Sequence, residues 1–226
     1  EGLKVGIIGI AATIIDKVMP DWFSEGIYFT LGKEELPYYI DKLRNERDVD
    51  LVVVLSHLGF PQETKLAEEI DGIDVLLSGH THNRVHKPAL INDTIIIQSG
   101  CHGSFVGKLD LKIDNSKVVD FNHQLVTIEK NIKEDEEVKK EIEKIMKPHR
   151  ERLNEVLGYT DTALHRNLVM ESTMDNFLLD SLLDLTGAEM AFSNGWRYGA
   201  PIVPGPITRN DLWNIIPVNP PVSTVK

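Results

Sequence analysis

The spacing of apolar positions in the first third of the chain predicts strands that alternate with helices. Three apolar runs have the length of buried strands: 4–10, 50–55 and 73–77. Two segments between them repeat their apolar residues at helical spacing: 34–46 and 62–70. The order strand, helix, strand, helix, strand predicts an α/β sheet of parallel character with helices on its faces.

The pattern changes beyond the third strand. Three more strands are predicted without helices between them: 94–98, 106–113 and 118–128. The last two are joined by a turn of polar residues at 114–117. We therefore expect the parallel sheet to gain antiparallel neighbours in this part of the chain.

The second half begins with a charged segment. Residues 133–157 are dense in Glu and Lys, which predicts a largely exposed helix that ends or breaks near Pro148. A helix at 172–185, a short strand at 189–192 and a short helix begun at Thr208 are expected to follow. This division predicts three parts, residues 1–130, a helical connector at 131–157, and a second domain at 158–226.

Composition narrows the class of function. The chain has 226 residues and a formal charge of −11, which repels the phosphates of a nucleic acid polymer but allows a small anionic substrate held by a cation or arginine. No stretch approaches the roughly 20 apolar residues needed to cross a bilayer. The single Cys101 excludes an internal disulfide and a cysteine-cluster metal site. Redox compartment and oligomeric state stay open.

Histidines follow two of the predicted strands. His57 comes after strand 50–55, and the sequence Ser-Gly-His-Thr-His places His80 and His82 after strand 73–77. Open α/β sheets bind ligands at the carboxyl ends of their strands, and neutral imidazole is a common ligand of divalent transition metals. The three side chains are therefore predicted to converge on metal ions, as in a hydrolase.

The remaining candidates have weaker support. Five other histidines have no partner at ligand spacing and are predicted to be surface or hydrogen-bonding residues: His86, His102, His123, His149 and His165. His102 lies nearest to the predicted site in sequence order. Cys101, which precedes it, is expected to be a small buried thiol rather than a nucleophile.

These motifs resemble a known family. The order of Ser-His-x-Gly at 56–59, Gly-His-x-His at 79–82 and Gln-Ser-Gly at 98–100 is similar to the second half of a calcineurin-like metallophosphoesterase domain, most closely in the 5'-nucleotidase branch. The resemblance implies part of a metallophosphoesterase β-sandwich with flanking helices, then a connector helix and part of an α+β C-terminal domain.

The resemblance also implies roles for these residues. His57 and His80 would bind one divalent ion and His82 a second, the ions being Mn, Zn, Fe or similar. Many 5'-nucleotidases carry Gln where this chain has His82. The family's other metal-binding blocks, Asp-x-His, Gly-Asp and Gly-Asn-His-Glu, precede the strand at which this chain starts. We therefore expect an internal fragment that contains no catalytic residue and is inactive alone.

The second half resembles the opening of the 5'-nucleotidase C-terminal domain. Residues 171–180 are similar to its first helix, and residues 188–197 to the strand and substrate loop that follow. The resemblance implies that Asn194, Gly195 and Arg197 contact a small anionic substrate, a nucleotide or phosphoester. It also implies action outside the cytoplasm.

The loop departs from the usual nucleotidase pattern Asn-x-Gly-Gly-x-Arg. Trp196-Arg197-Tyr198-Gly199 looks more like the thiosulfohydrolases of sulfur oxidation, which share the two-domain frame. Three functions therefore stay open: a phosphoester hydrolase of the 5'-nucleotidase or UDP-sugar hydrolase type, a thiosulfohydrolase, and a non-catalytic binding module.

Overall fold

The computed structural model describes residues 2–168, 170–193, 199–217 and 222–224, and it contains two compact units. The first unit comprises Glu1–Ile132 and the second Lys133–Lys226. None of the helices in these described ranges is long and apolar enough to span a membrane.

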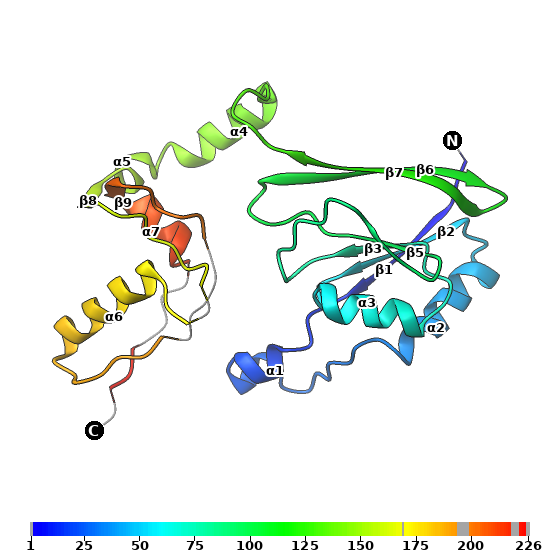
Figure 1. The fold of residues 1–226 in the computed structure, drawn as a ribbon, viewed down its shortest axis with the longest axis horizontal. Coiled ribbons are helices and arrows are strands. Elements are labelled where there is room, and N and C mark those ends of the chain that lie inside the picture. The colour runs from blue at the N-terminus through cyan, green and yellow to red at the C-terminus, as the bar shows by residue number, and fades with distance from the viewer. Residues whose placement is uncertain (1, 169, 194–198, 218–221, 225–226) are drawn as a thin grey trace. The chain divides into compact units, whose positions relative to one another are not determined.

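A five-stranded sheet forms the centre of the first unit (Figure 1). Its strand order is β1-β2-β3-β5-β4, with bounds Val5–Ile10, Leu51–Ser56, Val75–Ser78, Thr94–Ile97 and Ala89–Ile91. β1, β2, β3 and β5 run parallel to one another, and the edge strand β4 pairs antiparallel with β5. The predicted α/β class is confirmed, but β5 extends the parallel part of the sheet and β4 was not predicted.

Helices α2 (Glu35–Asp41) and α3 (Phe60–Glu69) cover one face of this sheet (Figure 1). A π-helical turn, Lys42–Glu46, continues α2 and completes the predicted helix at 34–46. Because alternate strand residues point to the same face, the strands contribute every second apolar residue to the core under the helices. That core contains Val52, Val54, Leu76 and Ile96 from the strands and Leu36, Ile40, Leu66 and Ala67 from the helices.

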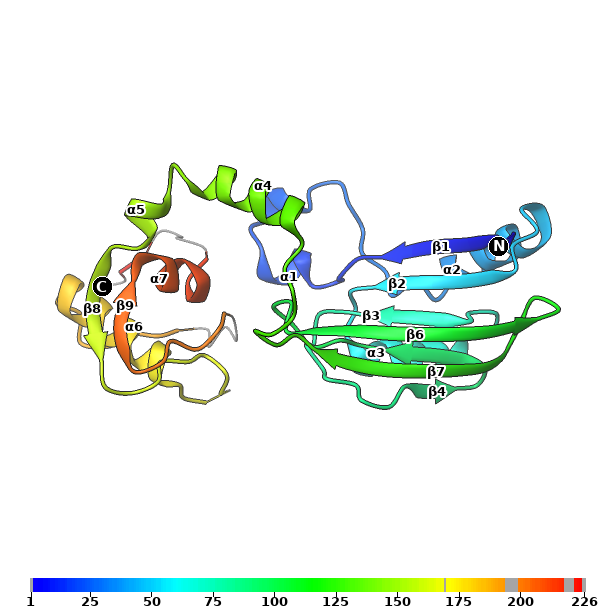
Figure 2. The same ribbon diagram turned by 90° about the horizontal axis from the view of Figure 1, so that it is seen from above.

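A long β-hairpin lies on the other face of the sheet (Figures 1 and 2). Its strands, β6 (Phe105–Asp114) and β7 (Lys117–Thr127), pair only with each other among the described strands and turn at the predicted polar residues. A side chain at Gly107 would collide with Ser99, so the start of the hairpin lies close to the segment that follows β5. The strand pattern alone predicted antiparallel neighbours within the main sheet, whereas the hairpin forms a separate two-stranded sheet. This second layer agrees with the β-sandwich that the resemblance implies.

The tip of the hairpin is tied to the start of β2. The hydroxyl of Ser116 donates a hydrogen bond of 2.6 Å to one carboxylate oxygen of Asp50, and the backbone N–H of Lys4 donates one of 2.8 Å to the other. The bond from Ser116, followed by that from Lys4, lowers the pKa of the Asp50 carboxyl below its usual value. Asp50 therefore joins the turn of the hairpin to the segments that precede β1 and β2.

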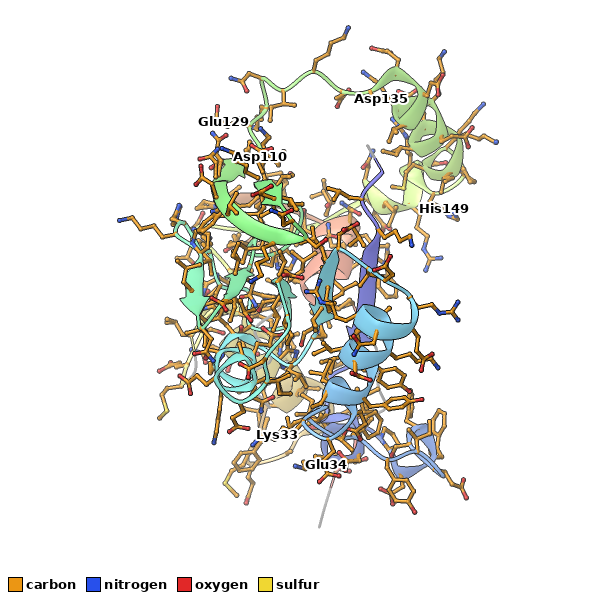
Figure 3. All side chains as sticks on the ribbon, turned by 90° about the vertical axis from the view of Figure 1, so that its right-hand side faces the viewer. Lys33, Glu34, Asp110, Glu129, Asp135 and His149 are labelled. Atoms are coloured by element: carbon orange, nitrogen blue, oxygen red, sulfur yellow. The ribbon has the colours of Figure 1, made fainter. Side chains whose placement is uncertain are left out.

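The second unit begins with the charged helix α4 (Glu136–Met146). Asp135 caps its N-terminus and accepts 3.0 Å hydrogen bonds from the backbone N–H groups of Glu137 and Val138. Figure 3 labels Asp135 at the start of this helix and His149 in the turn that follows it. A separate turn, α5 (Arg150–Leu153), follows Pro148, as the break predicted there requires. None of the residues of α4 or α5 is buried, so the exposed helix is confirmed.

The rest of the second unit packs two helices against a two-stranded sheet. β8 (Val156–Thr160) pairs antiparallel with β9 (Gly205–Thr208), and the helices are α6 (Thr173–Thr186) and α7 (Arg209–Ile215). Their core consists of Leu164, Met174, Ile202, Ile207 and Ile215. Both predicted helices are confirmed. The strand predicted at 189–192 is wrong, because these residues form no strand and the two-stranded sheet of this unit consists of β8 and β9.

Candidate metal centre

The three predicted metal ligands lie in loops at one edge of the parallel sheet. His57 directly follows β2, while His80 and His82 follow β3. The register of these two strands pairs Ser56 with Ser78, so both loops leave the sheet at the same level. The rings of His57 and His80 stand edge to face, with centroids 5.1 Å apart. The structure therefore brings this predicted pair together from segments 23 residues apart in sequence.

The absence of a side chain at Gly79 makes this approach possible. A Cβ atom at this position would lie 2.7 Å from Nδ1 of His57 and 3.2 Å from the carbonyl oxygen of Ser56. Both distances are shorter than the usual contacts of a Cβ atom. Glycine at position 79 is thus needed for packing, because it gives the His57 ring its place beside β3.

Gly79→Ala is therefore expected to displace His57 and to lower the free energy of unfolding by about 1–3 kcal/mol, the usual cost of overpacking. Thermal unfolding and zinc titration of the 226-residue chain measure the two effects. Gly9→Ala is the matched control, because a Cβ at that strand position meets no atom within 4 Å. Equal behaviour of the two variants would contradict this account of Gly79.

The loop between His57 and α3 is fixed by a second close contact. Gly59 has φ +101°, and a Cβ there would lie 2.8 Å from Cγ2 of Thr81. Thr81, in the loop after β3, accepts a 3.1 Å hydrogen bond from the backbone N–H of Phe60. The fully buried Glu63 accepts one of 3.1 Å from the N–H of Gly59. Both histidine loops are therefore held by contacts with each other and with α3.

Gln98 connects the site to β5, and the sequence analysis missed its role. Its buried side chain donates hydrogen bonds to the Ser78 hydroxyl at 2.5 Å and to the Gly79 carbonyl at 2.6 Å. Its amide oxygen accepts a hydrogen bond from the backbone N–H of Asn83. The polar Gln98 directly after three isoleucines was the available signal, because a buried amide requires hydrogen-bond partners.

The loop after β5 brings a third set of side chains to the same edge. The ring of His102 lies 5.7 Å from that of His82, centroid to centroid. The ligand atoms of His82, Cys101 and His102 all lie within 4.8 Å of one another. The expectation that His102 has no partner at ligand spacing is wrong, since 20 residues of sequence separate two loops that the parallel sheet makes adjacent.

These side chains suit a divalent transition metal. The rings of His57, His80 and His82 are on exposed residues, so ions can reach them from solvent. Imidazole nitrogens are ligands for Zn, Fe, Ni and Cu, and Gly79 leaves room for one of these rings. The donor set therefore fits the ions that the resemblance implies.

The predicted substrate loop, with Asn194, Gly195 and Arg197, lies outside the described residues. Ser193, which precedes it, donates a 3.1 Å hydrogen bond to the carboxylate of Asp175. The same carboxylate accepts 3.0 Å and 2.8 Å bonds from the Arg166 guanidinium and one of 2.5 Å from the Ser172 hydroxyl. The last described residue before the predicted loop is thus anchored in a buried ionic network.

The family model for the 5'-nucleotidase C-terminal domain matches residues 150–226. The second half of the chain is therefore similar to that domain. The recognition drawn from the sequence motifs is thereby confirmed for the second half of the chain, and the alignments described next extend it to the first.

Three relatives align with nearly the whole chain. The trifunctional nucleotide phosphoesterase protein YfkN of Bacillus subtilis is 30% identical over 96% of the chain and 16% of its own length. The uncharacterized metallophosphoesterase YunD of B. subtilis is 24% identical over 97% of the chain and 47% of its own. The solved structure of the sulfate thiohydrolase SoxB of Thermus thermophilus is 27% identical in sequence. The match covers 96% of this chain and 40% of the SoxB chain, with a TM-score of 0.89.

The chain thus spans less than half the length of each of these three proteins. The TM-score also confirms the fold class, since the likeness includes both units. By name, YfkN is a phosphoesterase, YunD a metallophosphoesterase and SoxB a thiohydrolase.

Proposed function

We propose that the protein to which this chain belongs is a metal-dependent hydrolase of small phosphoesters, with nucleotides as the substrate class. The observation that carries this proposal is the approach of His57 and His80, whose ring centroids lie 5.1 Å apart in loops at the carboxyl ends of two parallel strands. The nucleotide phosphoesterase among the relatives supports the substrate class. We further propose residues 1–130 and 158–226 as the two domains and 131–157 as their connector.

In this proposal the imidazoles of His57 and His80 hold one divalent ion and His82 contributes to a second. A divalent ion supplies Lewis-acid chemistry, since it withdraws electron density from a phosphoryl oxygen. The protein keeps the imidazoles at the sheet edge by the contacts of Gly79 and the hydrogen bonds of Gln98. In this proposal, this part of the chain contributes by positioning the metal ions rather than by transferring protons.

Asn194, Gly195 and Arg197 are proposed to bind the anionic group of the substrate. A guanidinium can donate two parallel hydrogen bonds to phosphate, sulfate or carboxylate. The anchored Ser193 supports this role, because a fixed neighbour reduces the entropy lost when the loop binds. Action outside the cytoplasm, which the resemblance implies, stays a prediction.

Sulfur chemistry is the second candidate function. It is favoured by the likeness to the sulfate thiohydrolase SoxB, at 27% identity and a TM-score of 0.89. Sulfate and phosphate are both tetrahedral anions, so the proposed roles of the imidazoles and of Arg197 apply to both. The two functions differ in the substrate accepted rather than in the part of the site described above.

The test compares the 226-residue chain with the full-length protein from the same gene. We expect metal-stimulated release of phosphate from nucleoside monophosphates by the full-length protein and no turnover by the 226-residue chain. His57→Ala in the full-length protein should abolish the activity, with His149→Ala, at the N-terminus of α5, as the control. Turnover of thiosulfate conjugates alone would favour the second function. Bound metal without either activity would indicate a binding module.

A further inference from the structure

The loop that follows β5 carries two metal-ligating side chains that the proposed function leaves unused. We propose that His82, Cys101 and His102 form a binding site for zinc, with two imidazole nitrogens and one thiolate as ligands. The ligand atoms of the three residues lie within 4.8 Å of one another. The proposal shares His82 with the proposed function, but it does not require hydrolysis.

Two loops are joined by backbone hydrogen bonds so that these residues meet. The N–H of Val85 donates to the carbonyl of Gln98 at 3.1 Å, and the N–H of Gly100 donates to the carbonyl of Asn83 at 2.9 Å. Between these bonds, Arg84 and Ser99 form an antiparallel bridge. The two segments therefore run side by side in opposite directions. This pairing brings His82, just before it, next to Cys101 and His102, just after it.

The backbone holds the two histidines in an uncommon conformation. His82 has φ +59° and His102 has φ +58°, both in the left-handed region. Among the described residues other than glycine, seven have positive φ, and three of these are His80, His82 and His102. Such residues cost about 1–3 kcal/mol each and gather at functional sites. The concentration of three at one sheet edge is consistent with a role in binding rather than in packing.

The donor set selects a thiophilic ion. Zinc binds thiolate sulfur at about 2.3 Å and imidazole nitrogen at about 2.0–2.1 Å, which places neighbouring ligand atoms about 3.4–3.6 Å apart in a tetrahedron. The cluster is within 4.8 Å, so rotations of side chains that close about 1 Å complete the geometry. Hard ions such as magnesium prefer oxygen ligands and would not gain from a thiolate. Three protein ligands also leave one position for water or substrate.

Burial of the cluster suits such a site. Cys101 is half-buried in the loop after β5. His82 and His102 are exposed, so an ion can reach the cluster from solvent. Cys101 is the chain's only cysteine, so a disulfide within the chain cannot compete for the sulfur. The flanking Gly100 and Gly103, at φ +68° and +67°, shape the turn that presents both side chains.

Cobalt is the probe for this proposal, because thiolate ligation gives a charge-transfer absorption band that nitrogen and oxygen ligands do not. We expect the reduced 226-residue chain to develop this band with cobalt and to lose it when zinc is added. Cys101→Ser should remove the band, and zinc affinity should fall at least about 100-fold, more than for a typical outer-shell partner. His102→Ala should weaken both the cobalt absorption band and the affinity for zinc. His86→Ala, an exposed histidine outside the cluster, should change neither.

A second readout uses the thiol directly. Zinc should slow alkylation of Cys101 in the wild type at least about 10-fold, and this protection should disappear in His82→Ala. Absence of the cobalt band at saturation, or an unchanged band in Cys101→Ser, would overturn the proposal. His57→Ala separates the two proposals. If the variant keeps the cobalt band but binds one metal ion fewer, both proposals are supported. If it keeps the band and binds the same number of metal ions, only the metal role of His57 is overturned.

Discussion

Gln98→Leu is expected to lower the free energy of unfolding of the first unit by about 2–4 kcal/mol, because each polar group left unpaired inside a protein costs about 1–3 kcal/mol. Leucine preserves the volume of the side chain but removes its hydrogen bonds to Ser78, Gly79 and Asn83. The loop that carries His80 and His82 would lose the side-chain hydrogen bonds that attach it to the end of β5 and would keep only the backbone bonds. Affinity for zinc should therefore fall about 10–100-fold, as for other partners that orient metal ligands.

Urea unfolding measures the first effect and calorimetric zinc titration the second. Gln124→Leu is the matched control, since Gln124 is an exposed glutamine on the hairpin strand β7. This control should change stability by no more than about 0.5 kcal/mol and leave zinc binding unchanged. Should Gln98→Leu bind zinc as tightly as the control, Gln98 would have a role in packing alone.

The strands of the first unit were predictable because their apolar residues are local and dense. Val52, Val54 and Leu76 lie in short apolar runs, and the alternation with helices implies that such runs become parallel neighbours. Parallel neighbours place the ends of their strands at one edge, so the meeting of His57 and His80 followed from strand order alone. The sequence was therefore sufficient for the part of the site that depends on topology.

The missed features depend on pairings between distant residues. β8 and β9 are short, contain Gly158 and Pro206, and become strands only through each other. The cluster of His82 and His102 likewise exists only because two loops run antiparallel, and neither loop has a periodic pattern that would predict this. Side-chain hydrogen bonds that hold a loop are invisible to periodicity, so Gln98 could be suspected only from its polarity.

The largest stability effect in the second unit is expected for Asp175→Ala. The side chains of Asp175 and Arg166 are only 9% and 6% exposed, and they form a 2.8 Å ion pair. Removing the carboxylate leaves a buried guanidinium without its charge partner, which costs about 3–5 kcal/mol. Asp180→Ala, an exposed aspartate of the same helix, is the control and should cost little. Urea unfolding of both variants checks this, and equal losses would contradict it.

The same network predicts how the stability of the second unit depends on pH. Burial alone would raise the pKa of Asp175, but hydrogen bonds from Ser172 and Arg166, the charge of Arg166 and a bond from Ser193 outweigh it and lower the pKa. A carboxyl with a lower pKa in the folded state binds protons more weakly than in the unfolded state, where its pKa is about 3.9. Its stabilising contribution is therefore complete above that pH and is lost as the pH falls through the folded value.

Asp175→Asn isolates this contribution, because it removes the charge while keeping the shape of the side chain. The stability difference between the wild type and Asp175→Asn should be constant from about pH 7 to about pH 5 and should shrink as the pH falls below about 4. Carboxyls elsewhere in the chain titrate in both proteins, so their effects cancel in this difference. Urea unfolding of the two proteins across this range measures it. A difference that stays constant through the acid range would mean that the Arg166 partnership does not depend on the charge of Asp175.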